Sequence, residues 1–86
     1  MKNNNLKIAI YSLINEPVIF DNVEYCTMQT KSGVIQVFKG HESMVTVIDG
    51  GFLKIKQFGK KLHTLDSITG FIKIKSDKIE IYKVVT

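Results

Sequence analysis

The residues that could do chemistry are few in this chain, and they lie far apart. It has two histidines, His41 and His63, and a single cysteine, Cys26. A structural zinc site needs about four such ligands close together, which these residues cannot supply. Cys26 has no partner for an internal disulfide and lies in a predicted strand, where a free cysteine usually acts as a small buried hydrophobe. We therefore expect neither a metal nor a cofactor.

The acidic residues also argue against catalysis. Hydrolysis needs a nucleophile beside a base, or two carboxylates in a shared cleft. Here the carboxylates fall almost one to a turn, which is the usual place for surface and turn residues. We predict a protein that is not an enzyme, and an enzyme on an unusual β-domain is only a third interpretation. The carboxylates in question are Glu16, Asp21, Asp49, Asp66 and Asp77.

The two histidines have different surroundings in the sequence. His63 lies in a segment predicted to be a strand, on its solvent face, and we assign it no role. His41 follows Gly40 in a predicted loop between two strands. A loop histidine is more often structural than functional, because its ring can bond a neighbouring backbone carbonyl and fix the loop.

The elements that carry these residues are predicted to be strands. From Leu6 onward apolar and polar residues alternate with a period of two, and no helical period is sustained. Turn signals every eight to twelve residues divide the chain into about nine or ten short strands, which is typical of an all-β sandwich or barrel. We expect one domain over residues 6–86, after a disordered segment at residues 1–5. The expected turns include 15–17, 21–22, 31–33, 49–51 and 59–61.

Two segments are near duplicates, Gly51–Lys56 and Gly70–Lys75. A repeat protein would contain at least three copies of its unit, so the duplication does not indicate one. We interpret the pair as two strands that begin at a glycine, with Leu and Ile directed inward and Lys outward.

The charge is basic but unusual in kind, with 12 lysines, no arginine and a net charge of +4. Arginine is the preferred residue for bidentate recognition of phosphates and bases, so the charge favours solubility or an acidic partner over sequence-specific nucleic-acid binding. An alternative is a small β-barrel that binds single-stranded nucleic acid through Phe52, Phe71 and the lysines beside them. No run approaches the roughly 18 apolar residues of a membrane span.

The order of motifs in the chain's middle is more specific than any single motif. A glycine turn at Gly33 precedes a short apolar strand over 34–38, a Gly-His loop at Gly40 and His41, and later the two Gly-Phe segments. In this order and spacing, residues 6–84 resemble the N-terminal β-sandwich domain of the epsilon subunit of bacterial F-type ATP synthases. The resemblance implies an all-β fold, a two-sheet antiparallel β-sandwich of about ten short strands.

The resemblance also implies a noncatalytic role in the rotor, or central stalk. The expected partners are the gamma subunit and the ring of membrane c subunits, with no nucleic acid and no direct membrane insertion. The subunit would be a monomer within the complex, on the cytoplasmic face of the bacterial inner membrane. A sheet face or edge that binds gamma would leave an apolar patch exposed in the free domain. The loops implied to face the ring contain Ser32, Gly33, Lys39, Gly40, His41 and Glu42.

The chain departs from the family pattern in several places. Ser32 and Val34 replace the carboxylates that usually flank the first glycine, and Lys39 replaces the loop proline. Without proline the loop is less preorganised, because its φ angle is not fixed. The sequence ends at Thr86, before the helical hairpin of most family members, so we expect no autoinhibition and no nucleotide site from this polypeptide.

Overall fold

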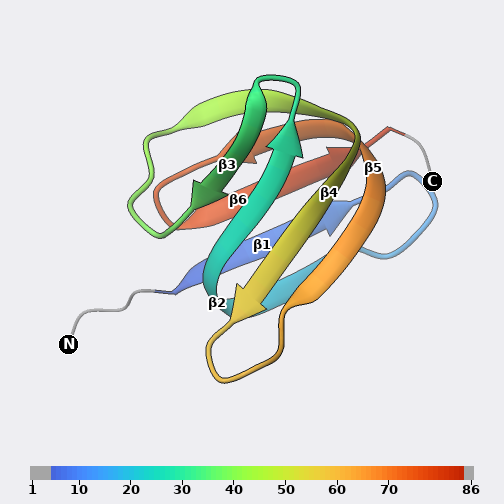
Figure 1. The fold of residues 1–86 in the computed structure, drawn as a ribbon. Coiled ribbons are helices and arrows are strands. Elements are labelled where there is room, and N and C mark those ends of the chain that lie inside the picture. The colour runs from blue at the N-terminus through green and yellow to red at the C-terminus, as the bar shows by residue number, and fades with distance from the viewer. Residues whose placement is uncertain (1–4, 85–86) are drawn as a thin grey trace.

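The computed structural model describes residues 5–84, which form strands and the turns between them (Figure 1). The all-β prediction is confirmed. The segment expected to be disordered, residues 1–5, lies outside the described residues except for Asn5. The strands are β1 (Leu6–Tyr11), β2 (Val18–Thr30), β3 (Gly33–Val37), β4 (Met44–Gln57), β5 (His63–Ile74) and β6 (Lys78–Lys83).

The predicted count of about ten strands becomes six, because the expected turns at 21–22 and 49–51, and a third point at Ser67, are bends inside long strands. Asn22 and Ser67 adopt positive φ angles of 57° and 58° within β2 and β5. In β4 the strand register shifts around Gly51. A β-bulge adds an extra residue, bends the strand and increases its twist without ending the pairing. The turn signals at 21–22 and 49–51 therefore mark bends and not chain reversals.

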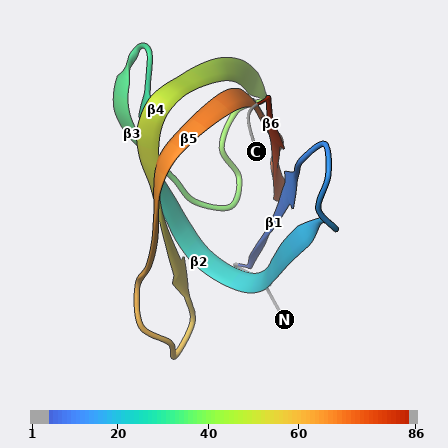
Figure 2. The same ribbon diagram turned by 90° about the vertical axis from the view of Figure 1, so that its right-hand side faces the viewer.

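Because β2, β4 and β5 bend, each contributes its two halves to different layers (Figure 2). The first sheet contains β1, β6 and residues 18–20 of β2, 44–49 of β4 and 68–74 of β5. The second sheet contains β3 and residues 23–30 of β2, 51–57 of β4 and 63–66 of β5. The hydrogen-bonded order β1-β6-β5-β4-β2-β3 is closed by a β1–β2 pair, so the sandwich is also barrel-like.

One pair departs from the predicted antiparallel arrangement. β1 and β6 run parallel, from Lys7 beside Lys78 to Tyr11 beside Tyr82. Parallel strands cannot be joined by a tight hairpin, and here the whole intervening chain provides the connection. The first and last strands of the chain are therefore neighbours in the first sheet.

The space between the two sheets is filled by aliphatic side chains from every strand. Cys26 is part of this core and fully buried, as predicted, and burial raises the pKa of its thiol to about 12. A thiol with so high a pKa is inert at neutral pH, because the thiolate is the reactive form. The core consists of Leu6, Ile8, Ile10, Val23, Cys26, Met28, Val37, Ile48, Leu53, Ile55, Ile68, Ile72, Ile74, Ile79 and Ile81.

The two near-duplicate segments begin at neighbouring bends of β4 and β5 but do not pair with each other. Gly51 pairs with Ile68, and Gly70 pairs with Ile48. Both glycines lie against another strand's backbone, since a Cβ at Gly51 would overlap the Gln29 carbonyl oxygen and one at Gly70 that of Tyr82. The duplication thus reflects two strands that bend at the same place, with their Leu and Ile residues buried as predicted.

Candidate partner-binding surfaces

The first group of predicted contact residues lies in the β2–β3 hairpin. The Thr30 hydroxyl accepts a hydrogen bond from the Ser32 N–H (3.1 Å) and donates one to the Gly33 carbonyl (2.7 Å). Gly33 has a φ of 120°, which favours glycine. The Lys31 N–H donates to the Val47 carbonyl of β4 at 2.9 Å, and the Lys31 Nζ lies 3.9 Å from an Asp49 carboxylate oxygen. The hairpin is therefore held against the first sheet, with Ser32 and Gly33 exposed.

The second group lies in the loop between β3 and β4. The Gly40 N–H donates to the Ser76 carbonyl at 2.6 Å, and Gly40 has a φ of 93°. The His41 ring nitrogen Nδ1 lies 2.7 Å from the Glu42 carbonyl oxygen, which is the neighbouring-carbonyl contact expected of a structural loop histidine. These contacts position the loop although Lys39 replaces the proline of the family pattern.

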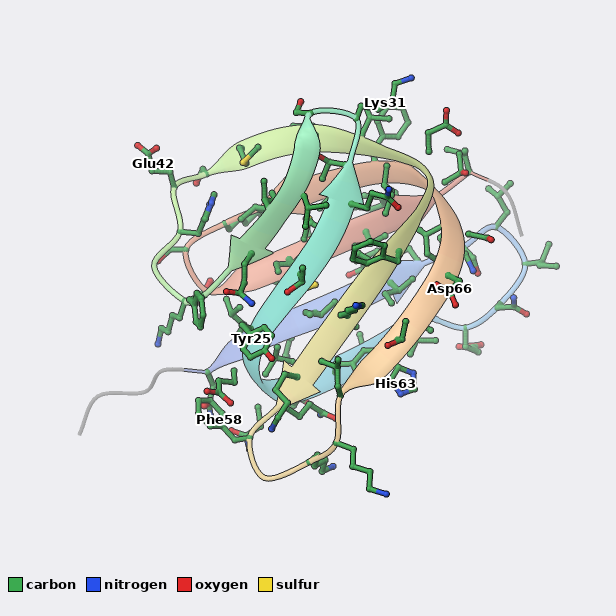
Figure 3. The ribbon with its side chains drawn as sticks, viewed as in Figure 1. Tyr25, Lys31, Glu42, Phe58, His63 and Asp66 are labelled. Atoms are coloured by element: carbon green, nitrogen blue, oxygen red, sulfur yellow. The ribbon has the colours of Figure 1, made fainter. Side chains whose placement is uncertain are left out.

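The structure does not join the two groups into one cluster. Ser32 and Gly33 lie at the start of β3, whereas Lys39, Gly40, His41 and Glu42 follow its end. The five residues of β3 span about 13 Å at the rise of an extended strand. In Figure 3 the side chains of Lys31 and Glu42, one from each loop, point away from each other.

A row of apolar side chains crosses the outer face of the first sheet. Val47 pairs with Phe71, Phe71 with Tyr82, and Tyr82 with Tyr11. Phe71 is 53% exposed, and the rings of Tyr11 and Tyr82 stack at 5.1 Å. We call these four residues the apolar row. Exposed Val45 and Val84 lie beside it, and a shallow hollow of about 280 Å³ is lined in part by Val47, Phe71 and Val84.

A nearly buried carboxylate lies next to this row, and the sequence interpretation missed it. The Glu80 carboxylate is 3.2 Å from the Lys78 Nζ and 3.8 Å from the Lys75 Nζ, and it accepts a hydrogen bond from the Tyr82 hydroxyl at 3.1 Å. The hydrogen bond from Lys78 lowers the pKa of Glu80, and burial partly offsets this by raising it. The hydrogen bond from Tyr82 and the charge of Lys75 lower the pKa further. The alternation of Lys78, Glu80 and Tyr82 could have indicated that all three share one face.

The two Phe-Lys pairs of the nucleic-acid alternative lie on different faces. Phe52 is on the outer face of the second sheet, where the Lys54 Nζ sits 5.0 Å from the centre of its ring. Phe71 is on the outer face of the first sheet. No continuous groove of aromatic and basic residues therefore connects the two pairs, as single-strand binding would require.

The second histidine singled out in the sequence lies on β5. His63 is exposed, as expected, and its ring packs against Phe20 with centroids 5.3 Å apart. Between Asn5 and Val84, no group of His, Cys, Asp or Glu is arranged to hold a metal ion. The same range contains no helix that is long and apolar enough to cross a membrane.

Curated relatives match most of the chain. The ATP synthase epsilon chains of Staphylococcus aureus strains JH9 and Newman are each 38% identical over 61 residues. The match covers 71% of this chain but only 45% of each relative, so the chain spans less than half of their length.

Solved structures match the fold over nearly the whole chain. A chain of the Euglena gracilis mitochondrial ATP synthase OSCP/F1/c-ring structure superposes with a TM-score of 0.78 at 22% identity, covering 99% of this chain and 53% of that one. A chain of the Tetrahymena thermophila central stalk/c-ring structure gives 0.74 at 15% identity, covering 99% and 67%. Residues 6–83 match the family described as the ATP synthase, Delta/Epsilon chain, beta-sandwich domain. The chain therefore belongs to the ATP synthase delta/epsilon family, as the order of its sequence motifs indicates.

Proposed function

We propose that this protein is a noncatalytic rotor subunit of a proton-translocating F-type ATP synthase, in which it links the gamma subunit to the c ring. The family match over residues 6–83 carries the proposal. In a bacterium, such a subunit would lie on the cytoplasmic face of the inner membrane and be held there through the complex as a monomer. It would take no part in nucleotide chemistry.

The apolar row is the surface that best fits the gamma subunit. Aromatic side chains are enriched at the centres of protein interfaces, because they bury a large area at a low cost in conformational entropy. Phe71 and the stacked Tyr11 and Tyr82 provide such a centre, with charged residues such as Lys73 and Glu80 at its side. A face of this composition would be covered in an assembly.

The two predicted ring-facing loops remain the proposed contacts with the c ring. Since they lie at the two ends of β3, a surface that touches both must extend along the length of this strand. Ser32 offers a neutral hydroxyl where the family pattern has a carboxylate, and Glu42 supplies an exposed carboxylate in the other loop. We expect hydrogen bonds to dominate at the first loop and charge at the second.

Copurification with gamma tests the proposal. The chain would carry an affinity tag and be coexpressed with the gamma subunit of the same organism, with the complex washed at increasing salt. A predominantly apolar interface should persist in high salt, because salt screens charges and not the burial of apolar surface. Binding to single-stranded DNA, the alternative, should instead weaken steeply. Failure to retain gamma even at low salt would refute the rotor function.

A further inference from the structure

Several strand segments have a neighbour on one side only. A sheet edge of this kind exposes unpaired N–H and C=O groups, which are a template for another chain. Within residues 5–84 these edges are β3, which pairs only with β2, and the first halves of β2, β4 and β5. Natural proteins usually protect such edges with proline, charge, bulges or a covering loop.

Three of the four edges carry this protection. Pro17 precedes the open part of β2. The Lys31 N–H bonds to the Val47 carbonyl and covers the open edge of β4. In β5 the open segment contains Asp66 and ends at Ser67, whose positive φ bends the strand.

The edge of β3 has no such protection within the strand. Its residues, Gly33–Val37, include no charge and no proline, and its pairing with β2 is regular. The N–H of Lys31 points toward β4, and successive strand residues direct their backbone groups to alternate sides, so Thr30 faces β3. Ile35 lies two residues after Gly33, the partner of Thr30, so its backbone N–H and C=O groups also face β2. The N–H and C=O groups of Val34 and Gln36 therefore point outward, away from β2. Val34 is also 59% exposed.

We propose that the open edge of β3 is a docking site at which an extended segment of another protein adds a strand to the second sheet. Backbone groups of Val34 and Gln36 would provide the hydrogen bonds, and the exposed Val34 side chain would contact alternate residues of the added strand. The geometry is that of β-strand addition, which requires a regular unprotected edge and no preformed pocket.

Charge selects the chemistry of the added segment. Lys31 and Lys39 lie four residues before and after Ile35, in the turns that flank β3. The Lys31 side chain also lies 3.9 Å from an Asp49 carboxylate oxygen, at the limit of an ion pair. If two copies of this chain paired β3 with β3 in antiparallel fashion about Ile35, each Lys31 would lie opposite a Lys39, which is unfavourable. A partner segment with an uncharged centre and acidic residues at both ends would place opposite charges there.

This proposal does not depend on the rotor function. The edge lies between the two loops that we assign to the c ring, so an added strand and the ring would compete for this side of the domain. Strand addition would then occur only when this subunit is not bound to the c ring. Binding to a peptide is measured without gamma or the ring, so the two proposals fail independently.

The test is a titration of the ¹⁵N-labelled chain with synthetic peptides, followed by NMR. One peptide alternates threonine and valine with an aspartate at each end, and a second has the same centre with lysine at each end. We expect the aspartate-ended peptide to shift the amide signals of Val34 and Gln36 first and to bind more tightly. Equal affinity of the two peptides, or shifts confined to the apolar row, would overturn the proposal, as would self-association of the chain through β3.

A matched pair of variants separates backbone pairing from side-chain contact. Gln36→Pro and Gln36→Ala both lose the hydrogen bond from Gln36 Nε2 to the Thr27 hydroxyl, but only proline removes the outward N–H. The Gln36→Pro variant should bind the peptide about fivefold more weakly than the Gln36→Ala variant, because it lacks the one hydrogen bond that the N–H of residue 36 would donate to the peptide. Equal binding by the two variants would contradict strand addition. If Gln36→Pro does not fold, Lys39→Glu decides, because it should reduce the preference for the aspartate-ended peptide.

Discussion

At the scale of single residues, Gly70 lies close against the backbone of β6. A Cβ there would overlap the Tyr82 carbonyl oxygen and press on the Lys83 backbone, and backbone atoms cannot move aside as a flexible side chain can. Gly70→Ala should therefore lower the free energy of unfolding by about 1–3 kcal/mol. Chemical denaturation followed by circular dichroism measures this.

Gly50→Asn provides the control for Gly70→Ala. Gly50 has a φ of 64°, and a Cβ there would meet nothing within 4 Å. Asparagine tolerates this backbone conformation better than other residues with a side chain, so stability should change little. If Gly70→Ala were as stable as Gly50→Asn, the close approach of β5 and β6 would be wrong.

Glu80 gives the protein an acid-sensitive contribution to stability. The pKa of Glu80 is lowered in the folded protein, so its ionised form stabilises the fold at any pH above the ordinary glutamate value of about 4.3. This contribution is lost as the pH falls through the lowered pKa. Glu80→Gln should cost about 1 kcal/mol at neutral pH, since its lysine partners are partly exposed.

The measurement for Glu80 is the difference in unfolding free energy between wild type and Glu80→Gln. We expect this difference to begin to fall near the ordinary glutamate pKa and to disappear in acid below the lowered pKa of Glu80. Asp66→Asn is the comparison, because Asp66 is exposed and forms no ion pair with another residue in the range 5–84. A difference for Glu80→Gln that stays constant with pH would assign its effect to packing.

At the scale of elements, the sequence predicts where the strands lie. It does not predict whether a strand ends at a break in the alternation or bends there and runs on. Alternation identified every strand, and Asp-Gly-Gly or Asp-Asn is a strong turn signal. A bulge and a reversal use the same residues, because both need positive φ angles and an interrupted alternation. Whether Asp49–Gly51 reverses the chain depends on the pairing of β4 with β5 far along the sequence, which local residues do not encode.

The contact surfaces were harder to predict than the fold. The two loops were proposed as ring contacts by their position in the sequence, and their separation along β3 follows from the length of that strand. The apolar row depends on residues from four strands that become neighbours only through register. Val47, Phe71, Tyr82 and Tyr11 are spread over most of the chain, so an exposed patch was expected and its location was not.

The loop between β3 and β4 is the element in which a functional and a structural histidine can be distinguished. The His41 ring bonds its neighbouring carbonyl, but the loop is also held by the Gly40 N–H, which does not need the ring. His41→Ala should therefore cost only about 0.5 kcal/mol of stability. In the reconstituted synthase it should weaken coupling between ring and stalk, measured as ATP-driven proton pumping per ATP hydrolysed.

His63→Ala is the matched control for His41→Ala. His63 is exposed on β5 and contacts Phe20, far from both proposed ring loops in sequence. It should leave coupling unchanged. A large fall in melting temperature for His41→Ala would mean instead that the His41 imidazole has a chiefly structural role.

At the scale of the whole molecule, the two outer faces of the sandwich differ in character. The first sheet presents an aromatic and aliphatic row from β4 to β1 with a satisfied acidic group beside it. The second sheet ends in the open edge of β3 and carries Phe52 beneath a lysine. The apolar row and the open edge of β3 therefore belong to different sheets.

One substitution on the apolar row and one away from it test whether gamma covers the row. Phe71 on the first sheet and Leu62 in the β4–β5 turn are similarly exposed, at 53% and 46%, so neither truncation should unfold the domain. If gamma covers the apolar row, Phe71→Ala should lose about 2 kcal/mol of binding, or roughly 30-fold in affinity, as a central aromatic residue does. Leu62→Ala should bind gamma as the wild type does. Calorimetric titration of gamma with each variant measures both, and the reverse order of affinities would move the gamma site away from the first sheet.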